Sequence, residues 1–521
     1  MKILYTSIFT LLFTLSSIGQ NTFNIRTNYG FPAAVITSVV PTDSCIYASG
    51  IISDSVFPYN TGAIFLKTDP LGVPEIIKTL RNEARTYEPW FNDMKFVDSS
   101  FLVSAVGLNS LMKSMLIKYD LFGDTVWTRE FPNPNPTLEF MQPRGGFELI
   151  GENDIVLINF TEVPPNGPFK DADVYFFKMK ENGDIVWSKF WGGNLIEEPS
   201  SSILANDTII IIGGMRHSLN IEDSDYSFQC FLLAIDTSGQ IQWTWLSPES
   251  WGLRDAARDM VLLEDGSLVI ACGIGHEQQR PSVNVVYFDK AVFKLNPQRE
   301  LEWEVVFPDP ELVLNSYTSR IIQLKNKSGF VVAGVAKRPT PPGVWGSNRG
   351  WIAKISPDGD SLWSRTYVYS TDFPSFHEFY DLKECPDGGL ILCGESRSVA
   401  NGDSIPQQAW LMKLDSFGCL VPGCQFIDAT EETKESVTLL LYPNPARDYL
   451  NFFYRPAPGQ SSRDIRFRII DASGMELQRF EAQSGEATYI VPLWHWPPGV
   501  YFLQLLHDGL PVRTERFVVG R

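Results

Sequence analysis

The chain has 521 residues, a length that fits several domains, and its 44% hydrophobic and 20% charged residues exclude a disordered chain. Its 39 Gly and 35 Pro indicate many turns. The formal net charge of −18 excludes nucleic acid as a partner, because a nucleic-acid binder must neutralise phosphates with Lys and Arg.

Residues 1–19 have the features of a secretory signal peptide. Lys2 precedes an apolar run over 3–15, and the small residues Ser17 and Gly19 stand at positions −3 and −1 of a cleavage site before Gln20. The alternative is a membrane anchor, but the run is short for a span. No Cys follows the cleavage site, which argues against a lipid anchor. We therefore predict an extracellular mature chain without a transmembrane segment.

A pattern of apolar run, charged turn with Gly, and Trp recurs along residues 20–425. Its copies include "IKYDLFGDTVW", "FKMKENGDIVW" and "AKISPDGDSLW", and the Trp stands at 127, 187, 243, 303 and 363. Two further copies carry Ile76 and Pro422 in place of Trp, and Arg299 replaces the Gly in one copy. Each copy follows two other β-rich runs joined by an Asp, Asn or Gly turn, which is typical of a hairpin.

Each unit of about 57 residues therefore holds four strands, and seven units predict an all-β, seven-bladed β-propeller over 20–425. One four-stranded sheet cannot cover both its faces, whereas radially arranged sheets bury each face against a neighbour. We expect the Trp on the outermost strand, packed against the next blade. The last unit breaks at "GCLVPGC", and "FNIRTNYGF" resembles a fourth strand, so the N-terminal segment is expected to complete the last blade.

The stretch "AIDTSGQIQW" loosely resembles the tryptophan-docking repeats of quinoprotein-like propellers, and also the aspartate boxes of sialidases. In both families the spacing from Asp to Gly to Trp differs from the spacing here. The resemblance covers only the outer hairpin, so it implies propeller geometry and no active site.

The seven Cys have no CxxC and no zinc-type spacing, and we predict neither a metal site nor a cofactor. Cys230, Cys272 and Cys393 lie in apolar strand patterns and are expected to be buried thiols. Cys419 and Cys424 flank the turn "LVPG" and are candidates for a disulfide in an oxidising compartment.

After an acidic linker at 426–438, the chain changes in style. Residues 439–521 alternate apolar and polar positions between turns, which predicts a small Ig-like β-sandwich. This segment has nine Arg and eight Asp plus Glu, a net charge of +1, so the rest of the chain carries −19. The shift in charge marks a domain boundary.

Motifs in these last 83 residues closely resemble the C-terminal sorting domain of the type IX (Por) secretion system of the Bacteroidetes. The residues that carry the resemblance are Tyr442, Pro443, Asn444, Pro445, Gly474, Pro498, Gly499, Val500, Tyr501 and the terminal "RFVV". The resemblance implies a partner, the type IX machinery, and passage through both membranes to the cell surface or beyond. In the family the domain is usually removed, and the cargo is released or attached to surface lipopolysaccharide. The alternative is a stabilising or ligand-binding sandwich.

The long loops of the propeller all fall on one face, where we expect any binding site. Aromatic and basic residues there suit sugar or protein contacts, although the rings could instead pin the loops. Three carboxylates at the entry to innermost strands could converge on a cation or a sugar hydroxyl, or bond their own turns. The candidates are Trp90, Trp251, Trp345, His377, Tyr380 and Arg254, with the carboxylates Asp93, Asp259 and Asp381.

"HEQQR" and "HEFYD" begin like a zinc protease helix but lack its second His, and we find no nucleophile elbow or phosphate-binding loop, so no catalytic residue is predicted. The first hypothesis is a non-catalytic module that binds a glycan or a surface protein. The second is a polysaccharide hydrolase or lyase, which paired carboxylates at the channel mouth would favour. A third is a structural surface-layer protein.

Overall fold

The fold is that of a computed structural model, and each of its two compact units, Met1–Pro422 and Gly423–Arg521, is considered by itself. The structure describes residues 20–520 except 55–59, 91–92, 109–111, 136–137, 139–140, 152–153, 164–170, 194, 218–227, 280–283, 310–315, 338–346, 370–374, 399–404, 422–423, 425–437, 443, 456–464, 472–473, 483–486 and 508–509. The predicted signal peptide at 1–19 and nearly all of the predicted linker therefore lie outside the described residues.

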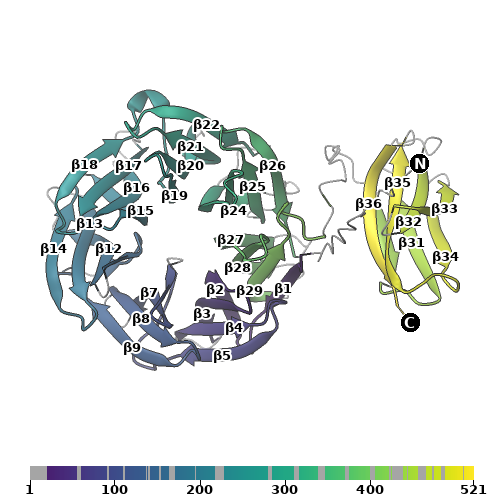
Figure 1. Cartoon of the computed structure of the whole chain (residues 1–521), viewed down its shortest axis with the longest axis horizontal. Coiled ribbons are helices and arrows are strands. Elements are labelled where there is room, and N and C mark those ends of the chain that lie inside the picture. The colour runs from purple at the N-terminus through teal and green to yellow at the C-terminus, as the bar shows by residue number, and fades with distance from the viewer. Residues whose placement is uncertain are drawn as a thin grey trace, which may run out of the picture. The chain divides into compact units, whose positions relative to one another are not determined.

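The first unit is a propeller-like ring of antiparallel sheets (Figure 1). The first half of the ring contains β2 (Ala33–Pro41), β3 (Ile46–Ser53), β4 (Thr61–Thr68) and β5 (Pro74–Leu80); β6 (Met94–Val97), β7 (Ser100–Leu108), β8 (Met112–Asp120) and β9 (Thr125–Phe131); and β10 (Met141–Gln142), β11 (Phe147–Ile150), β12 (Asp154–Val163), β13 (Asp171–Lys180) and β14 (Ile185–Trp191).

The ring continues in the same order along the chain. It contains β15 (Ile196–Asn206), β16 (Ile209–His217), β17 (Phe228–Asp236) and β18 (Ile241–Leu246); β19 (Asp259–Leu262), β20 (Leu268–Gln279), β21 (Asn284–Leu295) and β22 (Leu301–Phe307); β23 (Tyr317–Gln323), β24 (Phe330–Lys337), β25 (Asn348–Ile355) and β26 (Ser361–Tyr367); and β27 (Ser375–Glu384), β28 (Leu390–Ser398) and β29 (Ile405–Leu414). A short 3-10 turn, η1 (Glu249–Trp251), follows β18.

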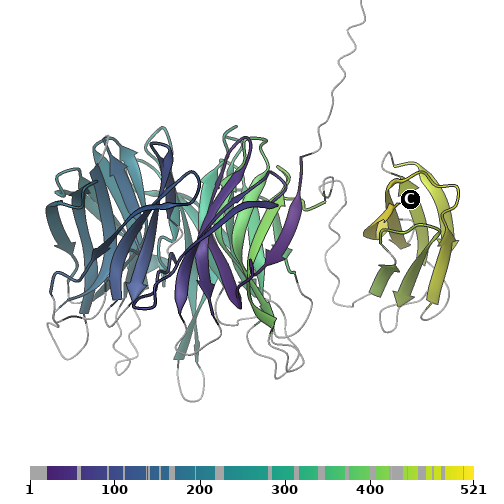
Figure 2. The same ribbon diagram turned by 90° about the horizontal axis from the view of Figure 1, so that it is seen from below.

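Burial follows the position of a strand in its sheet. The second and third strands of a sheet, such as β3 and β4, are almost continuously buried because both their faces meet neighbouring sheets. The fourth strands, such as β5 and β26, are largely exposed and form the outer wall. Figure 2 shows the sheets from the side, with their strands running side by side around the ring. The apolar cores therefore lie between adjacent sheets.

The repeated Trp lies on the outermost strand and packs on the next sheet, as predicted. Trp187 on β14 donates from Nε1 to the carbonyl of Thr237 at 3.1 Å, in the outer turn of the following sheet. A Cβ at Gly239 in that turn would come within 2.8 Å of the Trp187 ring, so the recurring Gly leaves room for the Trp. Arg299, which replaces this Gly once, keeps its positive φ of 67° and places its guanidinium over Trp243 at 4.6 Å.

The first strand of the described residues completes the last sheet, as predicted. Strand β1 (Phe23–Thr27) pairs antiparallel with β29, and Trp410 donates from Nε1 to Asn24 at 2.6 Å. Cys419 and Cys424 are both disulfide-bonded, whereas the other five Cys are buried free thiols. Burial raises the pKa of the Cys230 and Cys272 thiols.

The second unit consists of two sheets over one core. One sheet contains β30 (Thr438–Tyr442), β31 (Tyr449–Arg455) and β34 (Ala487–Pro492), and the other contains β33 (Glu476–Glu481), β32 (Ile465–Asp471), β35 (Gly499–His507) and β36 (Leu510–Val519). Phe452, Phe467 and Leu503 from the two sheets share the apolar core between them.

The motif residues of the sorting resemblance hold strand ends together. Asn444 donates to the carbonyl of Arg516 at 3.1 Å and accepts from the backbone N–H of Val518 at 2.9 Å, which ties the segment after β30 to β36. The Tyr501 hydroxyl donates to the carbonyl of Pro497 at 2.6 Å, and Gly499 begins β35. Tyr442 ends β30, Pro445 is exposed, and Pro443 lies outside the described residues. No helix among the described residues is long and apolar enough to cross a membrane.

Candidate functional site

A bulge recurs in the innermost strands of the ring. The inner ladders of β2, β15, β23 and β27 each contain such a bulge, which locally redirects a side chain, and β15 has a second one at Ala205. Apart from Ala205, the skipped residues are Thr37, Ser200, Ser319 and Tyr380. Three of them line the same cavity at the channel wall.

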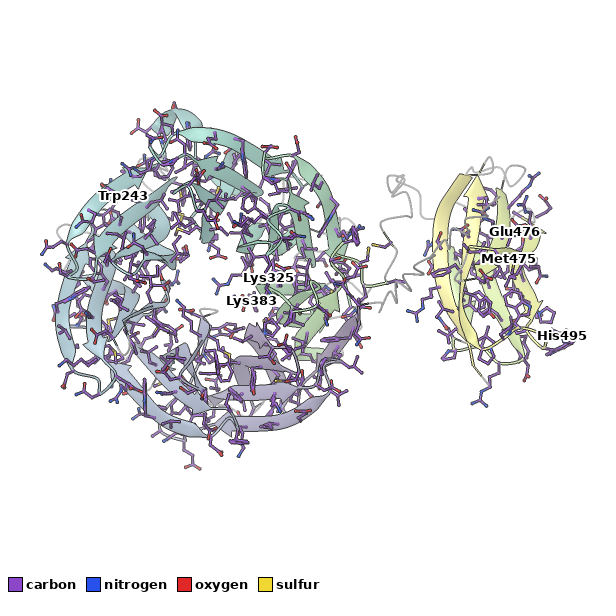
Figure 3. All side chains as sticks on the ribbon, viewed as in Figure 1. Trp243, Lys325, Lys383, Met475, Glu476 and His495 are labelled. Carbon is purple, nitrogen blue, oxygen red and sulfur yellow. The ribbon has the colours of Figure 1, made fainter. Side chains whose placement is uncertain are left out.

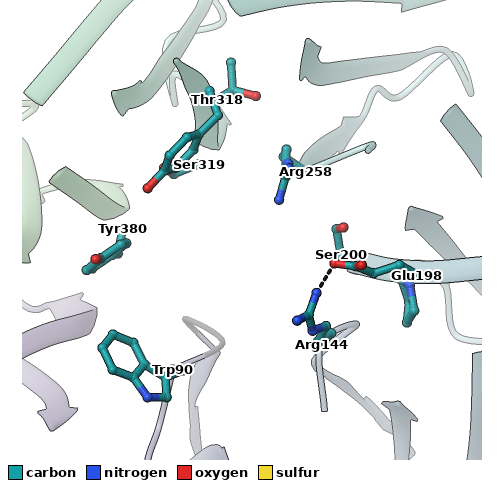
Figure 4. Close-up of a pocket in the computed structure, with 10 residues that line it drawn as sticks. Trp90, Arg144, Glu198, Ser200, Arg258, Thr318, Ser319 and Tyr380 are labelled. Atoms are coloured by element: carbon teal, nitrogen blue, oxygen red, sulfur yellow. Dashed lines mark hydrogen bonds and ion pairs between the residues drawn. The ribbon is translucent and has the colours of Figure 1, made fainter. Parts of the chain in front are cut away.

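The cavity has a volume of about 180 Å³ and is lined from six successive units of the ring (Figure 4). Its lining combines aromatic rings, two guanidinium groups, one carboxylate and several hydroxyl groups. The lining residues are Trp90, Arg144, Glu198, Pro199, Ser200, Arg258, Tyr317, Thr318, Ser319 and Tyr380.

Two predicted site residues, Trp90 and Tyr380, meet at one side of this cavity. Their rings stand edge to face with centroids 6.4 Å apart. Trp90 donates from Nε1 to Glu88 at 3.1 Å, and the Tyr380 hydroxyl donates to Glu378 at 3.1 Å. Burial, followed by the charges of Glu395 and Glu378, raises the pKa of Tyr380 well above its usual value. The pair is therefore a fixed aromatic surface with neutral polar edges.

Two arginines that the sequence did not single out lie on the opposite side (Figure 4). Arg144 forms an ion pair with Glu198 and donates from Nε to Gln142 at 2.8 Å. Burial, and then the like charge of Arg258, lower the pKa of Arg144 to about 10. Arg258 binds the Asp255 carboxylate at 2.9–3.1 Å. The two guanidinium groups thus repel one another on this side of the cavity.

The three predicted carboxylates bind the next sheet, and Asp381 also accepts the neighbouring backbone N–H of Leu382 at 2.9 Å. Each accepts a backbone N–H from the following inner strand: Asp93 from Phe147 at 2.7 Å, Asp259 from Ile321 at 2.9 Å, and Asp381 from Val39 at 3.0 Å. Among the described residues, no group of three or more His, Cys, Asp or Glu could hold a metal ion. The carboxylates are therefore clamps between sheets.

The cation that these carboxylates share belongs to the protein. Arg320 on β23 lies 3.1 Å from Asp381 and 3.7 Å from Asp259. Burial lowers the pKa of Arg320, but the charges of Asp259, Asp381 and Asp93 outweigh it and raise the pKa overall. Arg320 therefore holds the place between Asp259 and Asp381 that a bound cation would need.

Other predicted site residues are structural. Trp251 packs against Trp245 and Phe293, with ring centroids 5.8 and 6.0 Å apart. Arg254 is buried, pairs with Glu304 at 3.1 Å and lies over the Trp251 ring at 5.8 Å. These contacts agree with the alternative that the rings pin long loops.

His377 is also structural, and Trp345 is not described. The His377 ring is fully buried, with Nδ1 3.2 Å from the carbonyl of Asn348 and its centroid 5.6 Å from that of Trp410. Trp345 lies outside the described residues. Of the predicted site residues, the structure therefore brings only Trp90 and Tyr380 together at the cavity.

A carboxylate pair lies directly behind the aromatic side of the cavity, and the sequence analysis missed it. Glu378 on β27 stands opposite Glu395 on β28 in the ladder, a position at which Cβ atoms are about 4.5–5.5 Å apart. Tyr317 donates to Glu378 at 2.7 Å. Burial, and then the charge of Glu378, raise the pKa of Glu395 to about 7. A carboxyl group protonated near neutral pH beside a carboxylate can transfer protons.

The repeat offered a signal for one missed residue. Arg258 precedes the clamp Asp259 as Tyr380 precedes the clamp Asp381, so both residues occupy the same position in their units. Aligning the units on this Asp would have predicted that Arg258, like Tyr380, faces the channel. No comparable signal marks Glu395, because its partner lies on another strand.

Comparison with known proteins identifies the second unit. The family model of the secretion system C-terminal sorting domain matches residues 440–520. No curated protein matches the sequence. Solved structures similar to the chain include the polysaccharide lyase Uly1, with a TM-score of 0.42 and 9% identity over 73% of this chain and 90% of that one.

Two other similar structures have different activities. A subtype N11 neuraminidase-like protein of A/flat-faced bat/Peru/033/2010 (H18N11) has a TM-score of 0.33 and 11% identity over 76% of this chain and 94% of that one. A Glu150Gln mutant of Synechocystis apocarotenoid oxygenase, numbered as in that protein, has a TM-score of 0.40 and 10% identity over 78% and 93%. Likeness at this level carries no argument about function.

Proposed function

We propose that this chain, whose residues 440–520 are a type IX C-terminal sorting domain, is a secreted or cell-surface propeller that binds a ligand, a glycan or a surface protein, at its channel mouth. The sorting domain is the part that the type IX machinery recognises. Residues 1–19 would supply the signal for the inner membrane, and the mature protein would begin at Gln20.

The proposal includes a ring of seven blades followed by an Ig-like sandwich. Strands β10–β14 and β15–β18 form one nine-stranded sheet only through a single parallel bridge between Ala172 and Ile196. If this bridge is treated as a contact between two blades, every blade has four strand positions, with β10 and β11 sharing the innermost position. The count then agrees with the sequence repeat.

One observation supports binding: fixed side chains from six successive units converge on one cavity. The aromatic pair of Trp90 and Tyr380 offers a surface on which a sugar ring or an apolar side chain can stack. The hydroxyl and guanidinium groups opposite can donate hydrogen bonds to the same ligand. Such a combination of stacking and orienting groups is typical of a binding site.

The test is binding of the purified full chain to a glycan array and to surface proteins. Replacing Trp90 with Ala should weaken ligand binding about 10-fold or more, because buried aromatic anchors dominate binding energy. Trp494→Ala, which removes an exposed Trp of the sandwich, is the matched control. If Trp90→Ala leaves binding unchanged, the cavity is not the binding site.

A second candidate function is polysaccharide cleavage, and the Glu378–Glu395 pair is the observation that favours it. Tyr317 and Tyr380 connect this pair to the cavity through hydrogen bonds to Glu378. Turnover of a polysaccharide panel by the full chain tests this candidate. Glu395→Gln should abolish turnover and Glu264→Gln, at an exposed surface position, should not; a chain that binds polysaccharides without cleaving them excludes the enzyme.

A further inference from the structure

We infer that the ligand of the channel mouth is a polyanionic saccharide, with carboxylate or sulfate groups held by basic side chains that face the channel. This inference rests on the proposed glycan binding and specifies its substrate class. The evidence for it is which member of each ion pair in the ring, the basic or the acidic one, has the more exposed side chain.

On the channel wall, the basic member of an ion pair is the more exposed one. The Lys383 side chain is 38% exposed and its partner Asp381 only 1%; Arg258 is 35% exposed and Asp255 only 5%. Lys95 with Glu148, and Arg144 with Glu198, show the same order. In Figure 3, Lys383 and Lys325 lie at the central opening of the ring. The channel therefore presents positive charge in front of buried carboxylates.

In four ion pairs on the outer side of the sheets, the acidic member is instead the more exposed one. The Glu181 side chain is 43% exposed and its partner Lys118 only 16%; Glu302 is 38% exposed and Lys294 only 15%. Lys67 with Glu75, and Lys78 with Asp124, follow the same outer order. In these eight pairs, the acidic groups are thus exposed on the outer side of the sheets and the basic groups toward the channel. Such a distribution excludes polyanions from the outer surface and attracts them to the channel.

The buried carboxylates of the channel pairs have structural partners that hold them in place. Asp381 accepts the N–H of Val39, and Glu148 accepts the hydroxyl of Ser202 at 2.9 Å. Each basic side chain is thereby anchored at its carboxylate while keeping donors toward the channel. Guanidinium and ammonium donors bind carboxylate and sulfate oxygens strongly.

The aromatic pair favours a saccharide over an acidic peptide. Trp90 and Tyr380 are fixed by Glu88 and Glu378, so they form a preformed surface beside Arg144 and Arg258. The faces of a pyranose ring carry C–H groups that pack on aromatic rings, whereas an extended acidic peptide has no repeating flat unit. An acidic sugar polymer fits both the rings and the cations.

The experiment measures binding of the purified full chain to polygalacturonate, its fully methyl-esterified form, dextran, dextran sulfate and poly-glutamate. Polygalacturonate or dextran sulfate should bind and their uncharged counterparts should not, and the two charged polymers distinguish carboxylate from sulfate. Arg258→Gln and Lys383→Gln should each weaken binding about 10- to 100-fold, as for hydrogen bonds to charged groups. Arg81→Gln, which removes a similarly exposed Arg paired with Asp54 away from the cavity, should leave it unchanged.

Glu198→Gln is a second variant, which tests the inference even if the Arg258→Gln chain does not fold. It removes the carboxylate that neutralises Arg144, so it should strengthen polyanion binding. Weaker binding with Glu198→Gln, or equal binding of poly-glutamate, would overturn the inference. If only uncharged polymers bind, and Trp90→Ala abolishes that binding, the inference of a polyanionic ligand is overturned. The proposed glycan binding would then still hold. If no polymer and no array glycan binds, the proposed glycan binding fails as well.

Discussion

At the residue scale, one glycine per unit decides how tightly neighbouring sheets approach. Gly239, Gly359 and Gly418 have positive φ, and each lies against the Trp of the preceding sheet. The residue must satisfy two constraints at once, because the turn needs a left-handed backbone and the Trp occupies the space of a Cβ. Arg299 meets only the first constraint and covers its Trp with a guanidinium instead.

Replacing Gly239 with Ala should therefore destabilise the ring more than an equivalent change in an open turn. Gly239 and Gly266 both have positive φ, and each donates its N–H to the carbonyl three residues earlier. A Cβ added at Gly266, however, would have no neighbouring atom closer than 3.8 Å. The positive φ should cost each variant about 1–2 kcal/mol, and overlap with Trp187 should add about 1–3 kcal/mol to Gly239→Ala. Urea unfolding of both variants measures the difference; equal losses would show that the Trp contact contributes nothing.

Glu395 makes the stability of the ring depend on pH. Its pKa is raised from 4.5 to about 7 in the folded protein, so between these values the folded state binds the proton and the unfolded state does not. The free energy of unfolding should therefore fall as the pH rises from 4.5 to about 7. The loss from this one group is at most about 3 kcal/mol. Glu395→Gln should flatten this decline in urea unfolding between pH 5 and 8. A decline as steep as that of the parent chain would show that other groups cause it.

At the element scale, β1 is the strand on which closure of the ring depends. Its five residues pair in register with β29, and Ile25 stands opposite Leu411. Phe23 packs against the core between the first and last sheets. Because β29 would otherwise present an open edge, β1 both covers that edge and joins the two ends of the ring.

A proline within β1 should open this junction. Ile25→Pro fixes φ and removes a backbone N–H in the middle of the strand, which should cost about 3 kcal/mol. Asn21→Pro, at an exposed position before the strand, is the control. Limited proteolysis should cut Ile25→Pro faster than the control near both ends of the ring. Equal cleavage of the two variants would mean that β1 is dispensable.

At the scale of the whole molecule, each unit has its own core. The cores of the ring lie between adjacent sheets, and the sandwich buries its own set around Phe452 and Phe467. A change confined to the sandwich should therefore affect export without altering the ring. The clamp at Asn444 offers such a change, because its two hydrogen bonds lie wholly within the sandwich.

Asn444→Ala should lower the stability of the sandwich by about 1–3 kcal/mol, since two hydrogen bonds are lost. We expect less of the protein outside the cell and an unchanged melting transition of the ring, measured by immunoblotting of cell fractions and by calorimetry. Trp494→Ala, at an exposed site of the sandwich, serves as the control. Normal export of Asn444→Ala would show that the secretion machinery recognises this unit even when its fold is less stable.

Much of the ring could be predicted from sequence because its signals are local. The turn Gly and the Trp lie within one hairpin, and alternating apolar runs mark each strand. The channel could not be predicted in the same way, since Trp90, Arg144, Arg258 and Tyr380 meet only after the ring closes. Asp381 shows this limit: its hydrogen bond with the next residue, Leu382, is local, but its hydrogen bond with Val39 joins positions far apart in the sequence.

The pairing of β1 with β29 also requires that both ends of the ring be present in the same chain. Strand β1 finds its partner only when almost the whole ring has been made, because the contact between Asn24 and Trp410 spans 386 positions. A chain that lacks β1 leaves β29 with an unpaired edge, and such an edge is a template on which a strand of another chain can pair. Loss of this short N-terminal strand should therefore promote aggregation.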